Sequence, residues 1–314
     1  MTYTSNKSEV ANMIAREICI CIATHRRPQQ LERLLTSLVG QQEAPPFEVV
    51  VVDNDAAHSA ESAVSKFREK LHLTYLCEPV RGLARVRNRT VAASTSKFLA
   101  FIDDDHSADP RWLAAHYQIA MQMNAAAVIG RIDVWFADEV PDFIRVCSLF
   151  NKRRYADGEV VPWNHATTAN CFVRRDALPH PTAPFSPSFD LTGGEDVHLF
   201  RRMIDDGALV VAASQARTVG YRPATRATLY WILRRAFRNG GTIVEIDWGH
   251  CDWKGRIRRT LVAGVVGASH AAKGGRLWHR DKATAVQHLV QSGQEFGKVL
   301  RQLGIRIEEY RHHH

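Results

Sequence analysis

The chain has 314 residues, of which 45% are hydrophobic and 24% charged, and this composition excludes a small disulfide-stabilised scaffold and an intrinsically disordered chain. Its six cysteines lie mostly within apolar stretches, and we find neither a leader-like start nor an apolar run of roughly 20 residues, so we expect a cytoplasmic protein without membrane spans. The net charge of +8 is uneven, since residues 1–220 carry 24 Lys and Arg against 26 Asp and Glu, whereas residues 221–314 carry 17 against 7. Such a basic end is expected to attract a polyanion, whether nucleic acid, anionic lipid or another.

The first hundred residues alternate apolar runs with helical patterns. Buried strands are predicted for four runs rich in Ile, Val, Leu and Phe, at residues 17–23, 47–53, 71–77 and 97–103. Pro28 opens a helix with leucines along one face, and helical patterns also fill residues 56–70 and 82–94. This alternation predicts an α/β domain with a mostly parallel sheet, which binds ligands at the carboxyl ends of its strands.

The second half of the chain predicts fewer strands and longer helices. Residues 125–135 predict a strand and residues 140–187 predict loops and irregular strands. Further elements are predicted as helices at 197–205 and 228–238, a strand at 208–213, and two amphipathic helices within 256–272 and 286–303.

Three consecutive carboxylates, Asp103, Asp104 and Asp105, directly follow an apolar strand. Like charges repel one another, so a cation or hydrogen-bond donors must neutralise them. Asp103 and Asp105 are alternate residues and project to the same side of an extended chain. Their oxygens suit Mg²⁺ or Mn²⁺, which predicts a metal beside a nucleotide diphosphate, and the alternative is an Asp-rich turn in which Asp105 caps a helix.

Three further polar segments follow predicted strands or precede a helix. Residues 193–196, Gly-Gly-Glu-Asp, suit a tight loop whose carboxylate is either a helix cap or a general base. Residues 53–55, Asp-Asn-Asp, can accept hydrogen bonds from a base or ribose. The four arginines within residues 81–89 can contact phosphate or a base, or form a solvated helix face.

The order and spacing of these segments resemble the inverting glycosyltransferases of family 2. The resemblance spans residues 17–240 and rests on residues 20–28, 51–54, 84–88, 193–196 and the Asp103-x-Asp105 pair. It implies a GT-A fold, with a mostly parallel central sheet flanked by helices, followed here by a C-terminal amphipathic helical region. Within the family, residues 168–171, 174–176 and 193–196 resemble bacterial exopolysaccharide glucosyltransferases of the succinoglycan assembly type.

The resemblance also implies a role for individual residues. Asp196 would be the base that takes the acceptor's hydroxyl proton, and Asp105 and Asp103 would hold Mn²⁺ or Mg²⁺ at the diphosphate. Gly194 and Glu195 would contact the acceptor. A UDP-sugar donor would be bound by Thr24, Arg27, Asp53, Arg87, Asp103 and Asp104.

The sequence departs from the family pattern after the last predicted strand. Many relatives place a histidine metal ligand there, whereas residues 218–223 contain none. Arg222 is a candidate to share the neutralisation of the diphosphate, and His106 is either a metal ligand or a structural residue. Residues 234–240 lack the Gln-x-x-Arg-Trp signature of processive synthases, which favours transfer of single sugars.

The resemblance divides the chain into a flexible N-terminus (1–16), a GT-A catalytic domain (17–245), a basic helical tail (246–311) and a purification-tag remnant (312–314). Within the catalytic domain, residues 17–125 form the nucleotide-binding half and residues 126–245 the acceptor-binding half. The expected acceptor is a lipid-linked saccharide at the inner leaflet of the cytoplasmic membrane. The tail is expected to contact that anionic surface, and no nucleic-acid partner is expected.

Other functional classes fit the sequence less well. A nucleotide-sugar pyrophosphorylase or a dinucleotide dehydrogenase would need a Gly-rich phosphate loop, which residues 23–28 lack. The alternative outside enzymes is a non-catalytic protein that binds polyanions or polysaccharides through its basic tail.

Overall fold

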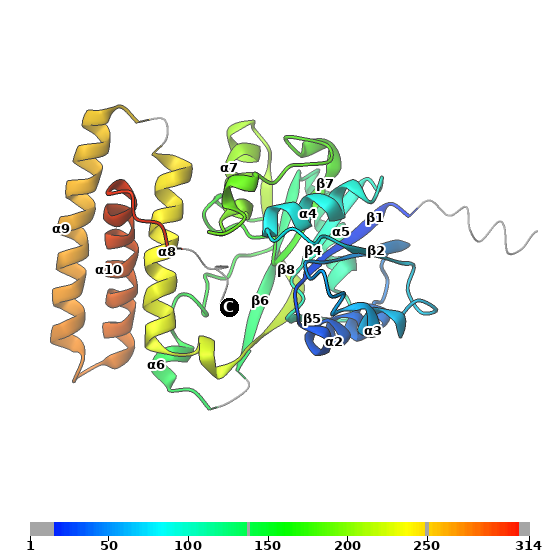
Figure 1. Cartoon of the computed structure of the whole chain (residues 1–314), viewed down its shortest axis with the longest axis horizontal. Coiled ribbons are helices and arrows are strands. Elements are labelled where there is room, and N and C mark those ends of the chain that lie inside the picture. Colours follow the sequence, from blue (N-terminus) through cyan, green and yellow to red (C-terminus); the bar gives the residue numbers. More distant parts are fainter. Residues whose placement is uncertain (1–15, 137–138, 249–250, 308–314) are drawn as a thin grey trace, which may run out of the picture.

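The computed structural model describes residues 16–136, 139–248 and 251–307. The predicted flexible N-terminus, apart from Arg16, and the tag remnant at 312–314 lie outside these residues. An eight-stranded sheet occupies one side of the molecule, and three long helices stand side by side on the other (Figure 1).

The sheet has the strand order β3-β2-β1-β4-β7-β6-β8-β5. Its strands are β1 Ile18–Thr24, β2 Phe47–Asp53, β3 Leu73–Cys77, β4 Phe98–Ile102, β5 His106–Ala108, β6 Ala127–Phe136, β7 Asn170–Arg174 and β8 Val210–Arg222. The first four pair in parallel, as β6 and β8 do, while β7 and β5 run antiparallel to their neighbours. The predicted mostly parallel sheet is therefore confirmed.

Helices cover both faces of the sheet. The helices are α2 Pro28–Val39, α3 Glu61–Ser65, α4 Leu83–Ala92, α5 Trp112–Met123, α6 Asp142–Arg145, α7 Glu195–Asp205, α8 Leu229–Asp247, α9 Trp253–Leu277 and α10 Lys282–Gln302. Because successive strand residues point to opposite faces, Ile20 and Ile22 of β1 pack in a core with α2, α3 and α5, whereas Cys19 and Cys21 pack in a second core with α4 and α7. This double burial explains the near-continuous apolar strands.

The elements predicted in the first hundred residues are confirmed close to their predicted bounds, with one exception. The helix expected within 56–70 is only α3, because the Asp53 carboxylate accepts a hydrogen bond from the Ala60 backbone N–H and holds residues 54–59 in a loop.

The structure sharpens two predictions for the second half. Residues 140–187 contain β7, a central strand whose side chains are buried on both faces and so show no alternation. The strand predicted at 208–213 extends to Arg222 as β8, so residues 218–222 belong to the sheet. Pairing with both β6 and β5 stabilises this extension.

The predicted tail helices are confirmed as α9 and α10. α10 lies between α8 and α9 (Figure 1) and contributes Val286 and Val290 to a core that also contains Ile232 and Ala236 of α8. The helices approach closely at Gly240, where an added Cβ would lie 1.9 Å from the Gln294 carbonyl oxygen. The predicted domain boundary at residue 245 falls near the end of α8. None of the helices in the described ranges combines the length and apolar character needed to cross a membrane.

Candidate active site

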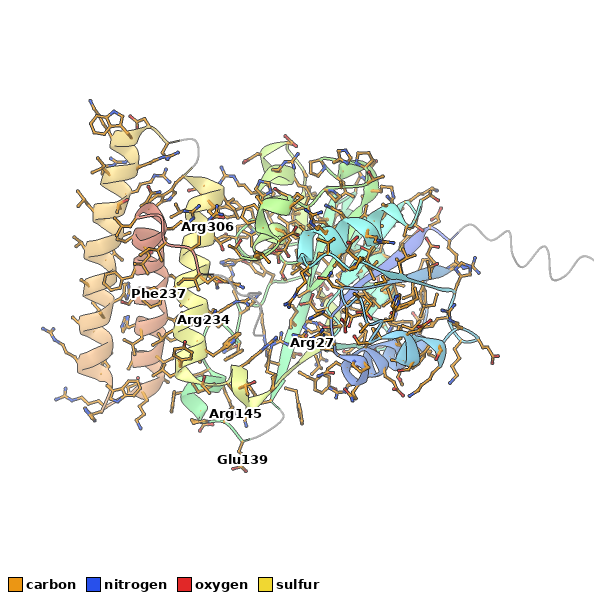
Figure 2. All side chains as sticks on the ribbon, viewed as in Figure 1. Arg27, Glu139, Arg145, Arg234, Phe237 and Arg306 are labelled. Atoms are coloured by element: carbon orange, nitrogen blue, oxygen red, sulfur yellow. The ribbon has the colours of Figure 1, made fainter. Side chains whose placement is uncertain are left out.

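A cleft of about 1590 Å³ opens at the carboxyl ends of β1 and β4 and extends to the helical bundle. Arg27 projects from the sheet side and Arg145 from α6 beside the bundle (Figure 2), and both side chains line the cleft. Residues 151–154, the start of α7 and the inner side of α8 complete its wall. The cleft therefore lies where the strand order predicts a ligand site.

Asp103 begins the loop after β4 and pairs with an arginine of α4. Arg87 Nη2 lies 3.2 Å from Asp103 Oδ1, and Arg87 Nη1 also donates to Glu195 Oε1 at the start of α7. Both Arg87 and Glu195 are buried. Burial raises the pKa of Glu195, and the Arg87 charge opposes that shift. Arg87 thus connects the strand-end acids to the helix that carries Asp196.

Asp104 turns away from Asp103, toward the end of β1. Thr24 Oγ1 donates to Asp104 Oδ2 at 2.8 Å, and Arg27 Nη1 donates to Asp104 Oδ1 at 2.9 Å. Burial raises the pKa of Asp104 to about 6, although the Arg27 charge lowers it. Asp104 therefore holds the β1 loop that carries Thr24 and Arg27 into the cleft.

Three arginine side chains surround one carboxylate oxygen of Asp105. Its Oδ2 lies 3.0 Å from Arg222 Nη1 and 3.6 Å from both Arg27 Nη1 and Arg226 Nη1. Burial by itself would raise the pKa of Asp105, but Arg222, His106 and the other arginines bring it below its ordinary value. Residues 218–223, which lack the histidine that many relatives have there, thus supply Arg222, which pairs directly with the expected metal ligand Asp105.

The residues present fit a divalent cation. Asp105 Oδ1 and His106 Nε2 are buried, lack hydrogen-bond partners and lie 3.6 Å apart. One ligand atom from each of Asp103, Asp105 and His106 lies within 4.8 Å of the others. An added Cβ on Gly220 would lie 2.8 Å from His106 Nε2, so the imidazole fills space that a side chain on β8 would need. An ion bound to these three residues would satisfy both orphaned atoms.

Asp196 lies in the first turn of α7 and lines the same cleft as the strand-end acids. Gly193 and Gly194 adopt positive φ angles of 71° and 101°, and a Cβ on Gly194 would lie 2.3 Å from Thr242 Cγ2, so glycine is required there. Asp196 Oδ2 accepts a hydrogen bond from Thr167 Oγ1 at 3.0 Å, and Oδ1 accepts one from the Val197 backbone N–H. Its carboxylate forms no ion pair within the part of the chain that the structure describes.

The structure brings most of the predicted site residues together. The cleft is lined by Thr24, Arg27, Arg87, Asp103, Asp104, Asp105, Gly194, Glu195 and Asp196. Asp53 does not join them, since it is fully buried and its carboxylate accepts hydrogen bonds from the Asp55 and Ala60 backbone and from Tyr75. Asp53 was expected to bind the UDP-sugar donor, and the structure instead gives it contacts within the β2 loop and with Tyr75 of β3.

Sequence reasoning missed several cations of the cleft. Arg226 follows β8 and pairs with Asp105, and Lys152 and Arg235 also line the cleft. The sequence signals for these cations were the basic run at residues 152–154 and the basic segment at residues 234–240, which resembles a helix near the active site in the family.

Comparison with known proteins identifies the family. A sequence model described as "Glycosyl transferase family 2" matches residues 19–180. The chain belongs to glycosyl transferase family 2. It is 31% identical over 229 residues to the succinoglycan biosynthesis protein ExoM of Rhizobium meliloti (strain 1021), covering 72% of this chain and 73% of ExoM. It is 25% identical over 232 residues to glycosyltransferase AglE of Haloferax volcanii, covering 73% of each protein.

Solved structures show the same fold. The mannosyltransferase PcManGT from Pyrobaculum calidifontis, in complex with GDP-Man and Mn²⁺, has a TM-score of 0.63 at 17% identity and covers 93% of this chain and 88% of its own. Residues 1–349 of TarS from S. aureus, in complex with UDP, have a TM-score of 0.55 at 14% identity and cover 92% of both chains. The GT-A fold of this family 2 member is therefore confirmed.

Proposed function

We propose that this family 2 glycosyltransferase transfers one sugar, glucose in the first instance, from a UDP-sugar to a lipid-linked saccharide in bacterial exopolysaccharide assembly. The similarity to ExoM supports the biosynthetic setting, and the UDP complex of TarS supports a uridine nucleotide. The observation that carries the proposal is the meeting of Asp103, Asp105 and Asp196 at one cleft.

The donor side of the cleft is built to hold a diphosphate. Asp103, Asp105 and His106 would hold Mn²⁺ or Mg²⁺, which when bound neutralises charge on the leaving diphosphate. Thr24 and Arg27, fixed by Asp104, border the same space, and Arg222 adds a cation from β8. These groups bind and orient the nucleotide so that the anomeric carbon faces Asp196.

Asp196 is the proposed base. The Thr167 hydroxyl and the Val197 N–H orient its carboxylate, which takes the proton of the acceptor hydroxyl. The acceptor oxygen forms a bond to the anomeric carbon as the bond to the diphosphate oxygen breaks, and the leaving oxygen keeps the electron pair. This single displacement inverts the anomeric centre.

The neighbouring carboxylate does not compete as a base or nucleophile. Glu195 is 2% exposed and its Oε1 is engaged by Arg87. With Glu195 engaged by Arg87, Asp196 is the carboxylate left to act at the start of α7, which supports a single displacement rather than the double displacement that uses two carboxylates. We assign Gly194 and Glu195 to the acceptor side, with the Gly194 backbone nearest the ligand.

The proposed acceptor is held on a membrane, and α9 offers a surface for that membrane. The exposed apolar side chains of α9 are Trp253, Ile257, Leu261, Val262 and Val265, each 52–72% exposed. Lys254, Arg258 and Arg276 are exposed on the same helix. An apolar face flanked by cations is typical of a helix that lies on an anionic leaflet.

Vesicle sedimentation tests this membrane contact. The full chain should pellet with phosphatidylglycerol vesicles more than with phosphatidylcholine vesicles, and salt should weaken binding. The double variant Leu261→Glu/Val265→Glu should lose most of this binding. Met121→Glu, an exposed apolar residue of α5, is the control. Equal binding by the double variant and the wild type would contradict the proposed surface.

Nucleotide release tests the catalytic proposal. Wild type, Asp105→Asn and Asp196→Asn are incubated with UDP-, GDP- and dTDP-sugars in Mn²⁺, Mg²⁺ or a chelator. Metal-dependent release from a UDP-sugar that both variants lose would support the donor, the metal and the base together. If no donor turns over and none raises the melting temperature, the proposal fails and polyanion binding by the basic tail takes its place.

A further inference from the structure

Lys152 stands out among the cations of the cleft. It belongs to the segment between α6 and β7, and its side chain is solvent-exposed in the cleft wall. Of the lysines and arginines that line the cleft, it alone has no hydrogen bond or ion pair within the described residues. Its neighbour Arg153, by contrast, lies 2.6 Å from Glu159 and over the ring of Tyr155.

Lys152 lines the same cleft as Asp103 and Asp196. Asp196 and Asp103 both attract its ammonium, whereas Arg235 and Arg222 repel it. An exposed ammonium without a hydrogen-bond or ion-pair partner among the described residues is available to an anion that enters the cleft.

We propose that Lys152 binds the diphosphate of the donor and stabilises its charge as it leaves, an inference that rests on the proposed function. The leaving phosphate must lie between the strand-end acids and Asp196, where the anomeric carbon is attacked. A phosphate carried by the acceptor lies further away, because at least one sugar ring separates it from the attacking hydroxyl.

In the reaction, the bond between the anomeric carbon and the β-phosphate oxygen breaks, and its electron pair moves to that oxygen. The acceptor oxygen forms the new bond and gives its proton to Asp196. Lys152 keeps its own proton and donates a charge-assisted hydrogen bond to the diphosphate.

Calorimetric titration with uridine, UMP and UDP tests this assignment. Lys152→Gln should bind uridine as the wild type does and bind UDP about 10- to 100-fold more weakly, as expected for the loss of a hydrogen bond to a charged group. Lys152→Arg should keep most of the affinity for UDP. Arg153→Gln, whose partner is Glu159, is the matched control and should bind all three compounds normally.

The outcomes separate this inference from the proposed function. Equal weakening of uridine and UDP would assign Lys152 a structural contact and overturn the proposal. An unchanged UDP affinity with a raised KM for the acceptor would move Lys152 to the acceptor and also overturn it. If the wild type binds none of UDP, GDP and dTDP, the proposed function itself fails and the diphosphate site fails with it.

Discussion

The cleft has two acidic walls, the strand-end acids Asp103, Asp104 and Asp105 and the carboxylate of Asp196 in α7, and the partners of these carboxylates differ. Asp103, Asp104 and Asp105 each contact an arginine. The partner of Asp103 is Arg87 of α4, that of Asp104 is Arg27 just before α2, and that of Asp105 is Arg222 of β8. Asp196 is held by the Thr167 hydroxyl and a backbone N–H. Arginine partners balance the negative charge of the strand-end acids, whereas the neutral donors of Asp196 orient its carboxylate without balancing its charge. The comparison suggests one wall for holding charge and another for accepting a proton.

The largest effect is expected when the proton acceptor is removed. Asp196→Asn should lower kcat by about 10²- to 10⁴-fold, since it removes a general base, and should leave the affinity for UDP within about twofold. Steady-state kinetics and calorimetry measure the two quantities. Asp133→Asn, another cleft carboxylate, is the control because Arg131 and Arg217 engage it. A wild-type kcat in Asp196→Asn would show that Asp196 is not the proton acceptor.

The second prediction concerns the arginine that joins the walls. Arg87→Met should lower the free energy of unfolding by about 3–5 kcal/mol, because it leaves Glu195 buried without its cation. Denaturant unfolding measures this loss, and Arg87→Met/Glu195→Gln should recover much of it. Arg85→Met breaks the more exposed pair with Asp190 and should cost under about 1 kcal/mol. Similar losses of unfolding free energy in Arg87→Met and Arg85→Met would mean that the buried ion pair contributes no more to stability than the exposed one.

Asp104, one of the strand-end acids, allows a test based on the pH dependence of stability. Its folded pKa of about 6 exceeds the ordinary 3.8, so the folded state binds more protons and this residue's contribution to stability falls as the pH rises from about 4 to about 6. The free energy of unfolding of Asp104→Asn relative to wild type should therefore increase over that window by about 2–3 kcal/mol and stay constant above it. Unfolding curves at several pH values measure the difference. A difference that does not vary with pH would contradict the raised pKa.

The smallest expected effect concerns the hydroxyl that orients the base. Thr167→Val should lower kcat about tenfold, because a donor that orients the charged carboxylate is lost. Steady-state kinetics measure the loss, and Thr167→Ser should retain the wild-type kcat. An unchanged kcat in Thr167→Val would show that this hydrogen bond is absent in the working enzyme.

Much of the fold follows from local sequence patterns. The apolar runs that form β1, β2, β3 and β4, and the leucine face of α2, are visible in single segments because strand and helix periodicity involves neighbours in the chain. The acidic and glycine-rich loops of the site follow from the same reading, because the ends of predicted strands and helices locate them. β7 escaped prediction, since a short strand buried on both faces carries no periodic signal.

The partners of the site residues were decided by tertiary structure. Whether Asp105 faces arginine depends on the pairing of β5 with β8, which brings Arg222 near it from more than a hundred residues away. Asp53 ends β2 and Asp103 directly follows β4, yet the Asp53 carboxylate is engaged by the Ala60 N–H and by Tyr75 of β3 and does not line the cleft. Sequence therefore determined which residues stand at the ends of strands and helices, because local periodicity reports them. Only the folded structure decided which charges meet and which, like Lys152, are left without a partner among the described residues, since ion pairs depend on distances between segments that the chain order does not contain.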